Sequence, residues 1–189
     1  MIAIDPKHTA LIVMDFQAEI VSQLADKAAP ALERGAGVVA AARKAGLSII
    51  YVVVGFRPGY PELSPRNPNY ERITQSGRFL GTPDIAAAVA PAPGDAIVVK
   101  RRVSAFSGTD LETLLRARGI DTLVLFGIAT SGVVLSTVRH GADADYRLVV
   151  IKDCCVDGDE EVHRVLTEKV LARQATMATA SEVTAALGG

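Results

Sequence analysis

The sequence has 189 residues, of which 49% are hydrophobic and 22% charged, and its formal net charge is −1. This length and apolar content predict a single domain, spanning residues 1–189, with a well-formed core. The near-neutral charge, with only a short basic run at 100–102, argues against nucleic acid or a membrane as a partner. No apolar stretch approaches the roughly 18 residues of a membrane-spanning helix, and residues 1–10 lack a signal-peptide pattern, so we expect a cytoplasmic protein.

The first part of the chain alternates short apolar runs with helical stretches. Residues 9–15 (TALIVMD) form a continuous apolar run, which is typical of a strand buried on both faces. The pattern at 29–46 predicts a helix with a basic last turn and a C-terminal glycine, and 47–54 predicts a second strand. The segment 55–73 is rich in Pro, Gly and Asn and is too long for a simple connector, which favours a lid or binding loop.

The rest of the chain continues the alternation. The predicted elements are, in order, a strand at 95–100, a helix at 110–119, a strand at 121–127, a helix at 131–146, a strand at 146–153, a helix at 160–174, and a short strand with a last helix within 175–183. Thr109 is a candidate N-cap for the helix at 110–119. Strands alternating with helices predict right-handed βαβ units. We therefore expect a three-layer α/β/α, Rossmann-like fold with a doubly wound sheet of six parallel strands.

In such sheets ligands bind beyond the carboxyl ends of the strands, so the residues that end strands are the candidates for chemistry. Asp15 ends the first strand, where partial burial raises a carboxyl pKa and suits an acid or base; alternatively it caps the following helix. Lys100 ends the third strand and either pairs with Asp15 or extends into solvent. The turn after Gly127 lacks a dinucleotide fingerprint, and is either a set of backbone donors for an oxyanion or an ordinary strand-to-helix turn.

The remaining reactive residue types give weaker indications. Cys154 and Cys155 are adjacent, which excludes a disulfide framework and a zinc site of the usual spacing. Asp153 and Asp157 flank them and would raise their thiol pKa, so neither thiol is expected to be catalytic. We predict no metal and no cofactor, because the histidines fall on different predicted elements: His8, His140 and His163, the last on a helix surface.

Two segments, TALIVMDFQ and KRRVSAFSGTDLETLLRARGIDTLVLFGIATSG, together resemble the isochorismatase-like cysteine hydrolases. That superfamily includes nicotinamidases, N-carbamoylsarcosine amidohydrolases and isochorismatases, and the resemblance covers residues 7–180. It implies that Asp15 is the acid/base aspartate of the family and that Lys100 is its catalytic lysine. It also implies a non-proline cis peptide at Ile128-Ala129 and an oxyanion hole made by the backbone N–H groups of Ala129 and Val133. The side chains or backbone groups that it assigns to substrate or oxyanion binding are those of Phe16, Gln17, Phe106, Ala129, Thr130 and Gly132.

The sequence departs from that family at the nucleophile. The family's turn reads Thr, two variable residues, then Cys-Val, whereas here Val133 holds the cysteine position. Valine cannot form a thioester, and Ser131, two residues away, has no predicted base beside it. The resemblance implies another route, because isochorismatases also lack the cysteine, usually with glycine in its place, and hydrolyse a vinyl ether with a protonated aspartate and water. The metal-binding Asp/His set of nicotinamidases has no match.

These features lead to one hypothesis with two alternatives. The first is a hydrolase that acts on a small molecule through Asp15 and Lys100 without a thiol, on a vinyl-ether, C–N or C–O bond. The second is a degenerate family member that binds a small acid or amide without turnover. A nucleotide- or flavin-binding protein is the third. We expect a homodimer or homotetramer. The loop at 55–80 is expected to contribute specificity, where Arg57 or Arg66 either clamps a substrate carboxylate or lies in solvent.

Overall fold

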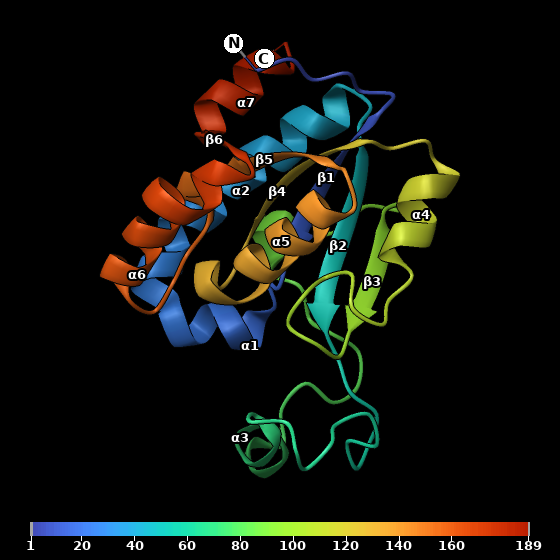
Figure 1. The fold of residues 1–189 in the computed structure, drawn as a ribbon, viewed down its shortest axis with the longest axis vertical. Coiled ribbons are helices and arrows are strands. Elements are labelled where there is room, and N and C mark those ends of the chain that lie inside the picture. The colour runs from blue at the N-terminus through green and yellow to red at the C-terminus, as the bar shows by residue number, and fades with distance from the viewer. Residues whose placement is uncertain (1, 189) are drawn as a thin grey trace.

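The fold is built on one six-stranded sheet. The structure is a computed structural model that describes residues 2–188. The strands are β1 (Thr9–Met14), β2 (Ser48–Val54), β3 (Ala96–Lys100), β4 (Thr122–Gly127), β5 (Arg147–Ile151) and β6 (Thr176–Ala178). All pairings are parallel, in the order β3-β2-β1-β4-β5-β6 (Figure 1). This confirms the predicted doubly wound parallel sheet, and it places the reversal of strand order between β1 and β4.

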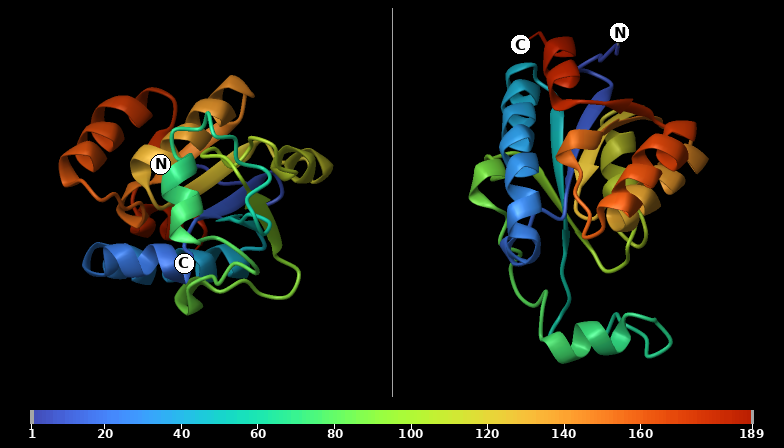
Figure 2. Two further views of the ribbon diagram at one scale, coloured as in Figure 1. Left: turned by 90° about the horizontal axis from the view of Figure 1, so that it is seen from below. Right: turned by 90° about the vertical axis from the view of Figure 1, so that its left-hand side faces the viewer.

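Helices cover both faces of the sheet. They are α1 (Ala18–Val21), α2 (Ala25–Lys44), α3 (Tyr70–Ser76), α4 (Leu111–Ala117), α5 (Leu135–Asp143), α6 (Glu160–Val165) and α7 (Ala180–Ala186). Figure 2 shows α2 and α7 on one face and α4, α5 and α6 on the other, which confirms the three-layer arrangement. Within residues 2–188, no helix is both long enough and apolar enough to cross a membrane.

The two central strands carry the core. Every residue of β1 and β4 is buried, as a continuous apolar run covered by helices on both faces requires. The edge strand β3 is less covered, and Ile97 in its middle is 48% exposed. The carboxyl ends of β1 and β4 are therefore the most enclosed end of the sheet, which is where Asp15 and the turn after Gly127 lie.

Several predicted helix boundaries differ from the structure, among them the starts of α2 and α4. The helix predicted to begin at 29 begins at Ala25, with Pro30 inside it. A proline removes one backbone hydrogen bond, but packing of this helix on β2 and α7 holds the turn before it in helical form. The N-cap position of α4 is Asp110 rather than Thr109, although the Thr109 hydroxyl still accepts a hydrogen bond from the Leu111 N–H at 3.3 Å.

Residues 55–80, here called the arm, project beyond the carboxyl ends of β2 and β3 (Figures 1 and 2). The arm was predicted as a loop, yet it contains α3, whose seven residues are too few to show a helical period in the sequence. It also has a small apolar cluster of its own, centred on Phe56, Tyr60 and Leu63. The Phe56 N–H donates to the Phe79 carbonyl at 2.8 Å, which closes the base of the arm. The arm is thus an ordered unit held at the sheet edge where ligands bind.

Gly127, the last residue of β4, sets the distance between β1 and the following turn. A Cβ added there would lie 2.8 Å from both Cβ and the carbonyl oxygen of Met14, and 3.3 Å from Cγ1 of Val133. Only a residue without a side chain therefore lets the two strands and the turn close together at the point where the strand order reverses.

We expect Gly127→Ala to lower the free energy of unfolding by about 1–3 kcal/mol, because the added methyl group forces backbone apart in a packed region. Urea denaturation measures it. The control is Gly37→Ala in α2, where an added Cβ would meet nothing within 4 Å and a gain of about 0.5–1 kcal/mol is expected. An unchanged urea midpoint for Gly127→Ala would show that β1 and the turn after β4 can move apart without loss of stability.

Candidate active site

The centre of the site is a buried ion pair. Nζ of Lys100 lies 2.9 Å from Oδ2 of Asp15, and the two side chains are only 4% and 5% exposed. Lys100 also donates to the Arg102 carbonyl at 3.2 Å, which fixes the direction of its side chain. A pair this deeply buried loses much of its hydration, so it is weak support for the stability of the fold and more consistent with a chemical role.

The positions of the two residues follow from the sheet topology. Asp15 directly follows β1, and its backbone has φ 60°, a left-handed conformation that aspartate tolerates better than most residues. Lys100 ends β3, which is separated from β1 by β2. Strands lie about 4.8 Å apart, so roughly 10 Å separates the two backbones, and only a long side chain crosses that distance. The alternative role of Asp15 as an N-cap is excluded by this pairing, because α1 begins three residues later with Gln17 at its N-cap position.

The second carboxylate oxygen of Asp15 distinguishes this pair from a structural one. Within residues 2–188, Oδ1 is buried and has no hydrogen-bond partner. Burial raises the pKa of Asp15 to about 6, although the nearby Lys100 ammonium acts in the opposite direction. Desolvation outweighs the effect of this positive charge, because the carboxyl group is almost completely buried. Near neutral pH, Asp15 can therefore both hold and release a proton.

The turn at 128–133 lies beside this carboxyl group. The Ile128-Ala129 peptide bond is cis, as the resemblance implies. Among the described residues, the Ala129 N–H has no hydrogen-bond acceptor. Val133 is only 2% exposed and is part of a turn wound as a π-helix that leads into α5. An apolar side chain therefore stands where a nucleophile would be needed.

The same turn is also held on the side away from Asp15, by contacts that the sequence did not predict. The Thr130 hydroxyl lies 2.8 Å from Nδ1 of His163, and the Ser131 N–H donates to Asp157 at 2.7 Å. Burial lowers the pKa of His163, which favours the neutral imidazole ring, and a neutral ring can accept a hydrogen bond from the Thr130 hydroxyl. His163 is thus half-buried, not on a helix surface as predicted, and Thr130 faces it instead of a substrate.

A cavity of about 210 Å³ opens onto Asp15. The sheet supplies its floor and the arm supplies one wall. Its lining residues are Asp15, Val54, Phe56, Leu63, Asn67, Asn69, Arg72, Ile73, Phe79, Lys100, Arg101, Arg102, Val103, Ile128, Ala129, Gly132 and Val133. The structure therefore brings five of the predicted site residues together: Asp15, Lys100, Ala129, Gly132 and Val133.

Two aromatic residues assigned to the substrate by resemblance lie elsewhere. Phe16 is in the core, edge-on to Phe126 with ring centroids 5.4 Å apart. Phe106 is also in the core, stacked on His140 with centroids 4.5 Å apart. Both rings are committed to packing, and we assign them no contact with a substrate.

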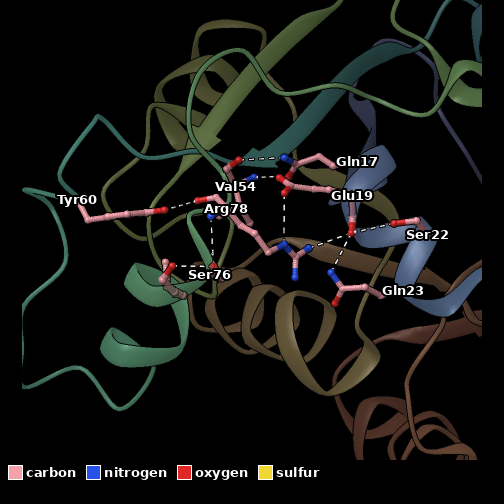
Figure 3. Close-up of polar contacts among 9 residues, drawn as sticks. Gln17, Glu19, Ser22, Gln23, Val54, Tyr60, Ser76 and Arg78 are labelled. Atoms are coloured by element: carbon pink, nitrogen blue, oxygen red, sulfur yellow. Dashed lines mark hydrogen bonds and ion pairs between the residues drawn. The ribbon is translucent and has the colours of Figure 1, made fainter.

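Gln17 has a different task, which is to hold the base of the arm (Figure 3). Its side-chain amide donates to the Val54 carbonyl at 3.0 Å and accepts from the Val54 N–H at 2.7 Å. Nearby, the Arg78 guanidinium lies 3.3 Å from the Glu19 carboxylate and donates to the Glu19 carbonyl at 2.9 Å, while the Tyr60 hydroxyl donates to the Arg78 carbonyl at 2.9 Å. These contacts fix the arm over the cavity.

The arginines of the cavity are not those that the sequence suggested. Arg57 pairs with Glu62 at 3.2 Å and its side chain is 71% exposed, and Arg66 is exposed outside the lining. Arg72 and Arg102 line the cavity instead. Of these two, only Arg102 could be noticed in the sequence, as part of the basic run at 100–102 after a predicted strand. Arg72 could not, because the position of α3 depends on how the arm folds.

The environment of the thiols does not favour reactivity, and their lack of a catalytic role stays a prediction. Cys154 and Cys155 are both buried and free. Burial raises the pKa of Cys155 to about 12 and that of Cys154 further, with Asp153 adding to both. Within residues 2–188, no group of three or more His, Cys, Asp or Glu side chains is placed to hold a metal ion. Independence of metals and cofactors stays a prediction, as do the homo-oligomer and the cytoplasmic location.

A larger hollow of about 790 Å³ lies at the amino ends of the strands, among the residues that begin β4 and β5, such as Thr122 and Arg147. Ligands of doubly wound sheets bind at the carboxyl ends of the strands. The smaller cavity, which holds the buried pair, is therefore the candidate active site.

Residues 9–182 match the family described as Isochorismatase domain. The chain belongs to the isochorismatase family. It is 35% identical to the ureidoacrylate amidohydrolase RutB of Methylobacterium radiotolerans, over 86% of this chain and 73% of that protein. It is 32% identical to the isochorismatase family protein YecD of Escherichia coli O157:H7, over 99% of this chain and 100% of that protein.

Solved structures of family members have the same fold. A cysteine hydrolase from Pseudomonas syringae pv. phaseolicola superposes with a TM-score of 0.90 at 25% identity, covering 100% of this chain and 96% of that one. The N-carbamoylsarcosine amidase of Thermoplasma acidophilum superposes with a TM-score of 0.75 at 27% identity, covering 91% and 96%. Together with the amidohydrolase relatives, these similarities establish an isochorismatase-like hydrolase.

The raised pKa of Asp15 has a consequence for stability. Its pKa is about 6 in the folded protein and 3.8 in the unfolded chain, so the folded state binds more protons between these values. Stability from this group is therefore greatest at low pH and falls as the pH rises from about 4 to about 6, by up to about 3 kcal/mol. We expect the unfolding free energy of the wild type, minus that of Asp15→Asn, to fall over this range and to be flat above it.

Urea denaturation at pH 4, 5, 6 and 7 measures this difference. Asp143→Asn, which removes an exposed carboxylate on α5, is the control and should give a much flatter difference. A difference that rises with pH would mean that the folded state prefers the ionised carboxylate, against the environment described for Asp15.

Proposed function

We propose that the protein hydrolyses a small molecule by acid catalysis from Asp15, with Lys100 as its electrostatic partner and water as the nucleophile. The observation that carries this proposal is the buried carboxyl group of Asp15, a residue that lines the cavity: one of its oxygens is held by Lys100, and the other has no hydrogen-bond partner within residues 2–188. The bond that suits this arrangement best is a vinyl ether, because its cleavage begins with protonation of carbon and needs no protein nucleophile.

Hydrolysis of a vinyl ether at this site begins with proton transfer and ends with loss of an alcohol. Oδ1 of protonated Asp15 gives its proton to the terminal vinyl carbon, which leaves an oxocarbenium ion on the substrate and a carboxylate on Asp15. Lys100 stabilises that carboxylate at 2.9 Å. Water adds to the cationic carbon and returns a proton to Asp15. The resulting hemiketal then loses the alcohol and gives a ketone.

Val133 supports this chemistry by its lack of reactivity. Its side chain is buried beside the cavity and adjoins Gly127, so it keeps water away from the carboxyl group. Exclusion of water raises the pKa of an acid and so preserves the protonated form that the first step requires. Ser131 does not substitute as a nucleophile, because it is exposed and its backbone is tied to Asp157.

Hydrolysis of a C–N bond is the second candidate, and it is favoured by the similarity to ureidoacrylate amidohydrolases. Without a thiol, water would attack the carbonyl carbon directly, with ionised Asp15 as the general base and the free Ala129 N–H as an oxyanion donor. The two candidates require opposite protonation states of the same carboxyl group. They therefore predict opposite dependences of rate on pH.

For vinyl-ether hydrolysis we expect kcat/KM to be highest below pH 6 and to fall above it by about tenfold per pH unit, because the protonated fraction of Asp15 falls. Asp15→Asn should reduce kcat/KM by roughly 10²- to 10⁴-fold, the usual contribution of a positioned acid. Turnover of a panel of small vinyl ethers and of ureido acids between pH 4 and 8 measures both effects.

The pH profile separates the candidates. A rate that rises through pH 6 and acts on ureido acids would favour C–N hydrolysis. Iodoacetamide treatment is the control for thiol chemistry and should leave the rate unchanged, because both cysteines are buried. Full activity of Asp15→Asn would refute either role of this residue. Binding without product from any substrate would indicate a protein that retains the cavity and lacks turnover.

Val133→Cys tests whether the rest of a thiol-dependent site is intact. A thiol at this position would lie beside Asp15 and Lys100, so we expect hydrolysis of ureidoacrylate to increase by about tenfold or more and to become sensitive to iodoacetamide. Val134→Cys, at the next buried position of the same turn, is the matched control and should gain nothing. An inactive Val133→Cys with unchanged melting temperature would show that the oxyanion site or the water path differs from that of thiol-dependent enzymes.

A further inference from the structure

The lining of the active-site cavity carries an excess of positive charge. Four basic side chains line it, from Arg72, Lys100, Arg101 and Arg102, whereas Asp15 is the only acidic one. This excess is local, because the whole chain has a net charge of −1. The basic residues come from two segments far apart in the sequence, the arm and the end of β3, and folding brings them around one cavity.

Two of the four cations have a carboxylate within 3.2 Å. Lys100 pairs with Asp15 at 2.9 Å, and Arg101 lies 3.2 Å from Glu62. Glu62 has no spare capacity for a third cation, because its carboxylate also lies 3.2 Å from Arg57. The charge that remains belongs to the other two arginines.

Arg72 and Arg102 have no carboxylate partner among residues 2–188. Each is nevertheless oriented by neutral oxygens. Arg72 donates to the Asn69 side chain at 3.0 Å, and Arg102 donates to the backbone carbonyls of Arg101 and Glu62 at 2.6 and 3.0 Å. Neutral acceptors hold a guanidinium in place without cancelling its charge, so both groups stay available to an anion.

The cavity is also divided by depth. Asp15 and Lys100 are buried at its floor, whereas Arg72 and Arg102 are exposed at its mouth. The lining also includes apolar side chains, such as Phe56 from the arm. A ligand that contacts the buried pair, the apolar side chains and the exposed arginines combines a reactive bond, an apolar segment and a negative charge.

We propose that Arg72 and Arg102 form the specificity subsite of this enzyme and select substrates that carry a carboxylate distal to the bond that is cleaved. Because part of each guanidinium is occupied by its neutral acceptors, the remaining donors fit the two oxygens of a carboxylate better than the larger set of a phosphate. The cavity of about 210 Å³ is smaller than the roughly 300–1,000 Å³ of sites for drug-sized ligands. The substrate is accordingly a small organic acid.

This inference rests on the proposed function for the identity of the reacting bond, but binding of the acid can be measured without any reaction. The substrate probes are 4-methoxypent-4-enoate, in which two methylene groups separate the vinyl ether from the carboxylate and whose hydrolysis releases 4-oxopentanoate and methanol, and its primary amide. The binding probes are 4-methoxypentanoate, which has no vinyl bond to hydrolyse, and its primary amide. Each acid and its amide have nearly the same shape and differ in charge.

We expect the acids to bind about 10- to 100-fold more tightly than the amides, as the loss of a charge-assisted hydrogen bond implies. Arg72→Gln and Arg102→Gln should each weaken binding of the acid by a similar factor, raise KM more than they lower kcat, and leave binding of the amide unchanged. Arg72→Lys should restore part of the loss. Arg118→Gln, an exposed arginine at the end of α4, is the matched control and should change nothing.

The outcomes separate the two proposals. If 4-methoxypentanoate binds in a manner that depends on both arginines but 4-methoxypent-4-enoate is not hydrolysed, the carboxylate subsite stands and the vinyl-ether reaction is refuted. If the amides bind as tightly as the acids, or if neither Arg→Gln variant changes the affinity for the acid, the subsite is refuted whatever the turnover. Because both side chains are exposed, the variants should fold, and their melting temperatures check this.

Discussion

The site depends on one constraint, which is that a carboxyl group and an ammonium group share an enclosure too apolar to hydrate either of them. Asp15 and Lys100 meet at 2.9 Å with less than a tenth of either side chain exposed. Attraction between them favours two charges, whereas desolvation favours a neutral acid. Desolvation prevails, and the pKa of Asp15 therefore rises to about 6. This balance gives a group that can deliver a proton near neutral pH, and the surrounding architecture serves to maintain it.

Val133 follows from the same constraint. In a site built around a thiolate, the residue at this position must be polar and accessible to its base. Here the position is occupied by a buried aliphatic side chain that adjoins Gly127 and extends the apolar wall next to Asp15. On the proposed mechanism, valine at this position precludes a covalent intermediate and favours the protonated form of Asp15. The free Ala129 N–H remains beside it, so the turn keeps the donor that a reaction through an oxyanion would use.

The arm gives this buried centre its access and its selectivity. The sheet alone would leave the carboxyl ends of β1 and β2 open to water. Gln17 and Arg78 fix the base of the arm, so that its apolar side chains cover the cavity and Arg72 reaches the mouth. The proposed catalytic and selective groups therefore lie on different structural elements: Asp15 and Lys100 are at strand ends, whereas Arg72 is on α3 and Arg102 is in the irregular segment after β3. On this proposal, substitutions in the arm change the preference for substrate without disturbing the acid.

The sequence by itself determined the sheet and the positions of Asp15 and Lys100 at strand ends, because continuous apolar runs ending in a charged residue have few structural interpretations in an α/β protein. Val133 was singled out by the resemblance of its turn to that of the family. Only the tertiary structure decided which side chains surround them. It moved Phe16 and Phe106 into the core, turned Thr130 toward His163, and replaced Arg57 and Arg66 by Arg72 and Arg102. The physical reason is that strand ends are fixed by local periodicity and sheet topology. The arm, in contrast, takes its shape from contacts between residues far apart in the chain, and these leave no period in the sequence.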